Sequence, residues 1–284
     1  MRLGTIRTGT GTATVRLEGD IAVEVGTSDV GALLATPGWH ARAAAAEGST
    51  HAVEGLDFAP LVLHPEKIIC VGLNYRNHIA EMGHDLPAHP TLFAKYPPSL
   101  IGAHDDIVLP AVSQQVDWEA ELGVVIGAPV RHASEGEAEG AIAGYTVVND
   151  VTARDWQART SQFLQGKTFE ATTPIGPWLV TSDDPAVAVG HFPMSCDVDG
   201  EHMQVADTAG LVFDAVALIR YCSTILTLVP GDVISTGTPG GVGAGRTPPR
   251  FLADGEVVVT RIEGIGELRN TCRADDPRGT VAAD

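Results

Sequence analysis

Positive charge is scarce in this sequence. Lysine and arginine together number 18 against 36 aspartates and glutamates, which gives a formal charge of −18, and lysine occurs only at Lys67, Lys95 and Lys167. A chain this acidic is repelled by nucleic acid and by anionic membrane surfaces, which argues against both as partners. An anionic small molecule can still bind where a metal ion or a few basic side chains supply local positive charge.

Cysteine is also rare. The four cysteines are widely separated and none stands in a Cys-x-x-Cys pair, which argues against a zinc site and a disulfide framework. No run approaches the roughly 20 apolar residues of a membrane-spanning helix, and the N-terminus lacks the apolar core of a signal peptide. We therefore expect a soluble, cytoplasmic protein with reduced cysteines in its core.

Signatures of nucleotide binding are missing as well. Gly166, Lys167 and Thr168 match the end of a P-loop, but position 161, where that motif needs a glycine, is Ser161. No Gly-x-Gly-x-x-Gly follows a predicted strand at the right place. Neither of the two common nucleotide-binding motifs is therefore present.

The 284 residues are enough to bury a full hydrophobic core. Short alternating segments and Ala/Gly-rich stretches predict a small α+β domain over residues 1–63, followed by a main domain over 64–276 and a tail over 277–284. Apolar residues at helical spacing predict one long helix over 207–228.

Acidic side chains stand out in the segment 116–127, which alternates like a β-strand. The alternation places Trp118 and other apolar residues on one face and Glu119 and Glu121 on the other. Two carboxylates on one face repel each other unless a cation lies between them, and a hard divalent metal ion suits oxygen ligands best. The alternative is a solvated strand face with two ordinary surface acids.

Further polar residues follow predicted strands. His78 and Glu81 share a face of a predicted helix, where a carboxylate beside an imidazole suits a general base, or where the two form an ordinary exposed pair. Asp150 ends the predicted strand 144–152 and is either a ligand-binding carboxylate or a helix cap. The glycine-rich segment 237–243 is either an anion-binding loop or a flexible connector.

Five sequence blocks occur in a characteristic order between about residue 67 and about residue 270. They are Val-Gly-Leu-Asn-Tyr-x-x-His-x-x-Glu-Met, Glu-x-Glu-Leu-x-Val-Val-Ile-Gly, Asn-Asp-Val-Thr-Ala-Arg-Asp, Gly-Lys-Thr-Phe-x-x-x-x-Pro-x-Gly-Pro and Ser-Thr-Gly-Thr-Pro-x-Gly-Val-Gly. Together they resemble the fumarylacetoacetate hydrolase family. Asn74 stands where fumarylacetoacetase has a fourth carboxylate, so the chain is more similar to the shorter bacterial acylpyruvase members.

The resemblance implies a mainly β, α+β fold with a mixed β-sandwich or barrel-like core that forms at least a homodimer. It also implies a Mg²⁺ or Mn²⁺ ion, with site residues carried over from the matching blocks. These are Glu119, Glu121 and Asp150 as metal ligands, His78 and Glu81 as the pair that activates water, Lys167 over the substrate's oxygens, and Thr238 in the loop that holds its carboxylate. Tyr75, Arg76 and Lys95 lie near these blocks in sequence and are considered as substrate contacts, Tyr75 foremost.

The activity implied first is hydrolytic cleavage of the C–C bond of a 2,4-dioxo acid, of the acylpyruvate or fumarylpyruvate type, to pyruvate and a carboxylic acid. One alternative uses the same metal for decarboxylation of oxaloacetate, or for isomerisation or decarboxylation of a 2-oxo dicarboxylic acid from aromatic breakdown. Another is a binding or structural protein that kept the fold and lost the chemistry. Retention of His78, Glu81, the three acids and Lys167 argues against this last alternative.

Overall fold

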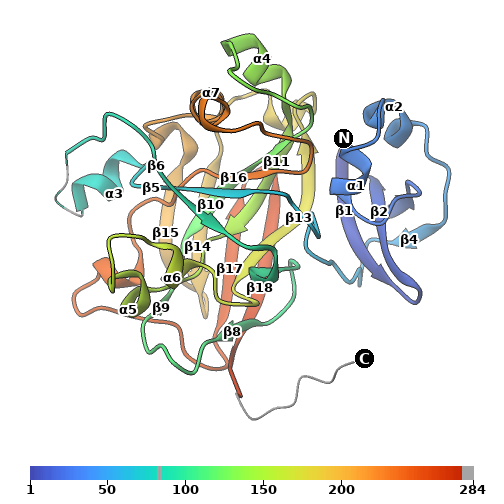
Figure 1. Ribbon diagram of the computed structural model, residues 1–284. Coiled ribbons are helices and arrows are strands. Elements are labelled where there is room, and N and C mark those ends of the chain that lie inside the picture. Colours follow the sequence, from blue (N-terminus) through green and yellow to red (C-terminus); the bar gives the residue numbers. More distant parts are fainter. Residues whose placement is uncertain (82, 84, 277–284) are drawn as a thin grey trace.

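The computed structural model describes residues 1–81, 83 and 85–276, without the side chains of His78, Ala80 and Glu81. A large mixed sheet runs through most of the molecule (Figure 1). In spatial order its strands are β4 (Thr50–Ala52), β3 (Ile21–Glu24), β2 (Gly11–Glu18), β1 (Arg2–Thr8), β13 (Thr173–Thr181), β11 (Ile142–Asn149), β10 (Ala120–Ile126), β16 (Val233–Ser235), β5 (Ile68–Gly72) and β6 (Thr91–Lys95), with β7 (Leu100–Ile101) paired to β13.

A second sheet packs against the first. Its order is β15 (Glu201–Asp207), β14 (Pro193–Val198), β17 (Val257–Ile262), β18 (Gly266–Ala274) and β8 (Ile107–Leu109). A short ladder of β9 (Val116–Asp117) and β12 (Thr152–Ala153) lies apart from both sheets. Most pairs are antiparallel, but β16 pairs with β5 in parallel, so the sheets are mixed. The predicted mainly β, α+β architecture is confirmed.

The helices are short and lie around the sheets (Figure 1). The α-helices are α1 (Val30–Leu34), α2 (Trp39–Ala44), α3 (Arg76–Glu81), α4 (Glu135–Gly140), α5 (Arg154–Gln157), α6 (Leu164–Lys167) and α7 (Ala215–Ile225). Single 3₁₀ turns are η1 (Pro97–Ser99), η2 (Pro185–Val187), η3 (Thr208–Gly210) and η4 (Gly243–Gly245). Across the described ranges, no helix is long and apolar enough to cross a membrane.

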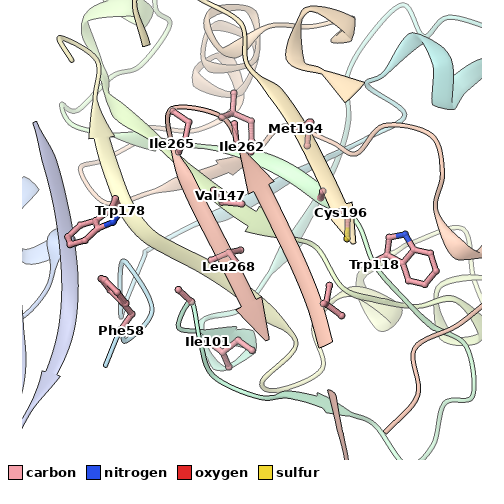
Figure 2. Close-up of a cluster of buried hydrophobic side chains, with 14 of the residues drawn as sticks. Phe58, Ile101, Trp118, Val147, Trp178, Met194, Cys196, Ile262, Ile265 and Leu268 are labelled. Atoms are coloured by element: carbon pink, nitrogen blue, oxygen red, sulfur yellow. The ribbon is translucent and has the colours of Figure 1, made fainter. Parts of the chain in front are cut away.

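The N-terminal strands join the large sheet through β1, which pairs with β13 at two register positions (Figure 1). An aromatic contact reinforces this junction, because the rings of Phe58 and Trp178 meet edge to face with centroids 5.0 Å apart (Figure 2). A Cβ atom at position 4 would lie 2.9 Å from the Trp178 ring, so only glycine lets β1 approach this ring so closely. The boundary predicted near residue 63 falls in the connection between β4 and β5.

The core between the two sheets is mainly apolar. Figure 2 shows Val147 of β11 beside Leu268 of β18 and Ile262 of β17, with Met194 and Cys196 of β14 at the edge of the group. Every residue of β10 is buried, because apolar clusters cover both of its faces. Glu121 of β10 and Glu119 directly before the strand are buried as well, so they do not form a solvated strand face.

Two predicted elements differ from the structure. The strand over 116–127 is interrupted at Trp118 and Glu119, because their backbone amides donate to the side chains of Asp117 (2.8 Å) and Asn149 (3.0 Å) rather than to a neighbouring strand. The helix over 207–228 is limited to α7, because Asp214 caps its N-terminus by accepting from the Ala217 amide at 2.8 Å.

Candidate active site

A cluster of three buried carboxylates lies at one end of β10. Glu119, Glu121 and Asp150 each offer an oxygen atom, and these atoms all lie within 4.8 Å of one another. Antiparallel pairing of Ala120 with Asn149 brings the two segments together, and the Asp150 amide donates to the Glu119 carbonyl at 2.8 Å. The sheet register therefore joins side chains that are some 30 residues apart in the sequence.

Two of the chain's lysines lie in this cluster. The Lys167 ammonium donates to Glu119 Oε2 at 2.6 Å and to Asp150 Oδ2 at 2.8 Å, while Lys95 donates to the other oxygen of Asp150 at 2.6 Å. Burial disfavours the charged form of Lys167, but the charges of Asp150 and Glu119 outweigh it and raise the pKa of Lys167. These two carboxylates therefore favour the protonated, charged form of Lys167.

Glu121 is held differently. Its Oε2 accepts hydrogen bonds from the Ser235 hydroxyl at 2.6 Å and from the Gly237 amide at 2.8 Å, and among the described residues no lysine or arginine forms an ion pair with it. Burial, reinforced by the charges of Asp150 and Glu119, raises the pKa of Glu121 well above its ordinary value. A cation bound beside Glu121 would favour its charged form and lower its pKa.

The donor set fits a hard divalent ion. Glu119, Glu121 and Asp150 offer only oxygen ligands, as Mg²⁺ and Mn²⁺ prefer, and their spacing allows one ion to be shared among them. The two lysines neutralise part of the charge of the cluster without reaching Glu121. The residues present are therefore suited to hold a Mg²⁺ or Mn²⁺ ion.

Arg154 links the cluster to the glycine-rich loop. Its guanidinium donates to Asp117 at 2.8 Å and lies 2.7 Å from Glu119 Oε1. Burial alone would lower the pKa of Arg154, but the charges of Asp117 and Glu119 raise it. Asp117 also accepts from the amides of Gly243 (2.7 Å) and Ala244 (3.0 Å), which ties down the loop. Within the described part of the chain, the buried Nη2 of Arg154 has no hydrogen-bond partner.

A cavity of about 290 Å³ opens beside these side chains. Glu119, Lys167 and Arg154 contribute the charged residues of its lining. The lining residues are Val71, Gly72, Leu73, Phe93, Glu119, Arg154, Gln157, Ala158, Thr160, Phe163, Lys167 and Thr238. Cationic and apolar groups thus surround a space next to the candidate metal ligands, which suits a small anionic organic molecule.

Comparison with known proteins agrees with this arrangement. The family model described as fumarylacetoacetate (FAA) hydrolase C-terminal matches residues 67–273. The chain belongs to the fumarylacetoacetate hydrolase family. The human mitochondrial oxaloacetate tautomerase FAHD2A is 45% identical over 216 residues, which cover 75% of this chain and 68% of the relative.

Solved structures of the family show the same fold. The 5-carboxymethyl-2-hydroxymuconate delta-isomerase from Mycobacterium smegmatis superposes with a TM-score of 0.81 and 33% identity, over 97% of this chain and 100% of that one. The fumarylacetoacetate hydrolase from Exiguobacterium antarcticum gives a TM-score of 0.84 and 33% identity over the same shares. The match of the family model confirms the family membership predicted from the sequence blocks. This family is enzymatic and usually depends on a divalent metal.

The family resemblance predicted site residues that the structure brings together in part. Glu119, Glu121, Asp150 and Lys167 form one cluster, and Thr238 lines the adjoining cavity. The Thr238 hydroxyl already donates to the Ala120 carbonyl at 3.0 Å and accepts from the Gln204 side chain at 2.8 Å. Its hydroxyl proton is therefore used within the protein.

Other predicted residues lie elsewhere. Tyr75 is buried in the core, where its hydroxyl donates to the sulfur of Met194 at 3.0 Å, and the structure does not bring it to the cavity. Arg76 is exposed on α3. The backbones of His78 and Glu81 also lie on α3, but their side chains lie outside the described residues, so this catalytic pair stays a prediction.

Sequence reasoning missed two charged residues of this candidate site. Arg154 stands in the Asn-Asp-Val-Thr-Ala-Arg-Asp block but received no role, although a basic residue four positions after Asp150 was a usable signal. Asp117 shares the strand alternation of Glu119 and Glu121, so a third acid on one face was visible. Lys95 was considered as a substrate contact, whereas the structure pairs it with Asp150 in the core.

Proposed function

We propose that this protein is a metal-dependent enzyme that moves a proton at the carbon next to the 2-oxo group of a short dicarboxylic acid. Such a reaction interconverts keto and enol forms or shifts a double bond. The alternative reading of the sequence is thereby preferred over C–C bond hydrolysis. The names of the human tautomerase and the mycobacterial isomerase support this preference, because both describe rearrangements that need no added water.

The observation that carries the proposal is that Arg154, whose buried Nη2 has no hydrogen-bond partner among the described residues, lines a cavity next to three oxygen ligands. The first carboxylate and the keto oxygen of the substrate are placed at the metal end of this cavity, beside Lys167. The second carboxylate is placed against Arg154, since a guanidinium binds a carboxylate strongly. A dicarboxylate therefore satisfies both ends of the cavity, and a monocarboxylate satisfies one.

The chemistry follows from these placements. A Mg²⁺ or Mn²⁺ ion held by the acidic cluster would supply Lewis acidity to the 2-oxo group. Lys167, whose charged form is favoured by Asp150 and Glu119, would offer positive charge where negative charge develops on the substrate oxygen. His78 is on α3, which begins three residues after the cavity-lining residue Leu73; it is proposed as the group that takes and returns the proton, with Glu81 orienting it. The homodimer expected from the family resemblance stays a proposal.

The test follows the enol absorbance of oxaloacetate and of acetylpyruvate in Mg²⁺, with pyruvate and CO₂ measured separately. We expect the wild type to accelerate ketonisation of oxaloacetate, and we expect His78→Ala to abolish this. Arg154→Lys should raise the KM for oxaloacetate by about tenfold or more, because a charge-assisted hydrogen bond contributes roughly 1.5–3 kcal/mol.

Arg159→Lys is the matched control, because Arg159 belongs to the same segment but stacks on the Trp156 ring at 3.4 Å. The KM of Arg159→Lys for oxaloacetate should equal that of the wild type. Hydrolysis of acetylpyruvate without acceleration of oxaloacetate ketonisation would refute the proposal and restore C–C bond hydrolysis as the activity, in line with the similarity to the Exiguobacterium enzyme. Release of CO₂ from oxaloacetate in step with its loss would instead identify a decarboxylase.

A further inference from the structure

Two phenylalanine rings form one wall of the cavity. Phe93 is in β6 and Phe163 directly precedes α6, and both residues line the cavity. Their ring centroids lie 5.8 Å apart at an interplanar angle of 71°, an edge-to-face contact that fixes both rings. Lys167 Nζ lies 5.0 Å from the centroid of the Phe93 ring. The contacts therefore run from the charged end of the site through Phe93 to Phe163.

Gly72 makes room for the second ring. A methyl group at position 72 would lie 3.3 Å from Cε2 of Phe163 and 3.7 Å from Thr91 Cγ2. Its backbone is not in the left-handed region, so the absence of a side chain matters for space and not for conformation. The Phe163 ring thus lies across Gly72 and takes up cavity volume that a smaller residue at position 163 would leave open.

This wall is apolar, whereas other parts of the cavity lining carry charged side chains. Arg154, Lys167 and Glu119 supply its ionic groups, whereas Phe93, Phe163 and Val71 supply hydrocarbon. Its volume of about 290 Å³ is at the lower end of ligand sites, which typically measure about 300–1,000 Å³. A substrate with more carbons between its carboxylates needs additional space beside the ionic groups, and Phe163 is among the apolar residues that bound this space.

We propose that Phe163 is the specificity-determining residue that restricts this site to short 2-oxo dicarboxylates. The proposal rests on the function proposed above and names the substrate length for that same site. Removal of the ring opens space beside Gly72 for the additional carbons of a longer chain. A change of this size in a hydrophobic pocket alters discrimination by roughly 10- to 200-fold.

The experiment compares oxaloacetate, with four carbons, and 2-hydroxyhepta-2,4-diene-1,7-dioate, with seven. The readout is the ratio of kcat/KM for the longer substrate to that for the shorter one. We expect Phe163→Ala to raise this ratio by about tenfold or more. Phe169→Ala is the matched control, because Phe169 packs against Trp156 with centroids 5.3 Å apart and does not line the cavity. It should leave the ratio unchanged.

A second variant tests the same contact from the other side. In Gly72→Ala the new methyl group would lie 3.3 Å from Cε2 of Phe163, a contact tight enough to displace the ring, so we expect the KM for oxaloacetate to rise several-fold. In the double variant Gly72→Ala with Phe163→Ala the methyl group meets no ring, and the effect of Gly72→Ala should disappear. Such non-additivity is the signature of direct contact. Calorimetric titration with oxalate in Mg²⁺ serves as a measure of an intact ionic end in each variant.

The outcomes separate the two proposals. If the wild type does not act on oxaloacetate but hydrolyses acetylpyruvate, the proposed function fails and the length limit fails with it. If all variants bind oxalate and the wild type ketonises oxaloacetate, but Phe163→Ala leaves the ratio of the two substrates unchanged, the length limit alone is refuted. Equal effects of Gly72→Ala in both backgrounds would also refute it.

Discussion

Replacement of Glu121 by glutamine should uncouple stability from metal binding. Glu121 is fully buried beside two other carboxylates and is bonded only to uncharged donors, Ser235 and Gly237, among the described residues. A glutamine keeps the size and one acceptor oxygen while it removes the repulsive charge. Without metal, Glu121→Gln should therefore be at least as stable as the wild type.

The metal-bound comparison has the opposite sign. An ion that binds only the folded protein adds about 2.7 kcal/mol of stability at 100 times its dissociation constant. For a chain of this size about 1 kcal/mol corresponds to roughly 2–4 °C in melting temperature, so the wild type should gain roughly 5–10 °C. Glu121→Gln lacks the one carboxylate of the cluster that forms no ion pair with a lysine or arginine among the described residues. Its gain in melting temperature at the same metal concentration should therefore be near zero.

The assay is thermal unfolding followed by circular dichroism, in EDTA and in a series of Mg²⁺ or Mn²⁺ concentrations. Glu139→Gln, an exposed carboxylate on α4, is the control and should respond to metal like the wild type. A large loss of stability of Glu121→Gln in EDTA would contradict the repulsion argument. An undiminished metal response of this variant would show that the ion does not bind at the cluster.

Further substitutions test the network around the cluster. Asp117→Ala leaves Arg154 short of a partner, so we expect a loss of about 3–5 kcal/mol in urea unfolding, and Asp117→Asn should lose less; equal stability of both variants and wild type would contradict this. At Gly243 a methyl group would lie 1.9 Å from the Arg250 carbonyl, so Gly243→Ala should cost about 1–3 kcal/mol or more in the same assay, and an unchanged midpoint would contradict the geometry. Lys167→Met should lower kcat for oxaloacetate by about 100-fold, whereas Lys67→Met, which removes two ion pairs outside the site, should keep kcat; similar losses in both would argue for a general effect of lysine removal.

The sequence contained most of the candidate metal site. The spacing of Glu119 and Glu121 and the position of Asp150 after a β-branched run were local signals, and the order of the blocks supplied the rest. Lys167 was also indicated by its block. What the sequence could not show is that Lys167 contacts two of the three acids, because that contact depends on where α6 packs against the sheet.

Buried polar networks were harder to predict. Asp117 and Arg154 received no role in the sequence analysis, because their burial depends on the ladder of β9 with β12 and on the loop that contains Gly243. The break of the predicted strand at Trp118 has the same origin, because side-chain acceptors replace the ladder partners of the backbone. Periodicity indicates which face of a strand is apolar, but it does not show where a side-chain acceptor replaces the backbone partner of an amide.

The parallel pair of β16 with β5 has a consequence for folding kinetics. Asp232, next to β16, accepts a hydrogen bond from the backbone amide of Lys67, next to β5, across a sequence separation of 165 residues. Glu121 depends on β16 and the loop after it for its hydrogen-bond donors. Such distant pairings form slowly, and the carboxylate cluster is complete only after they exist. A bound ion should therefore slow unfolding while it leaves the folding rate unchanged. The metal would then increase the kinetic stability of the folded protein.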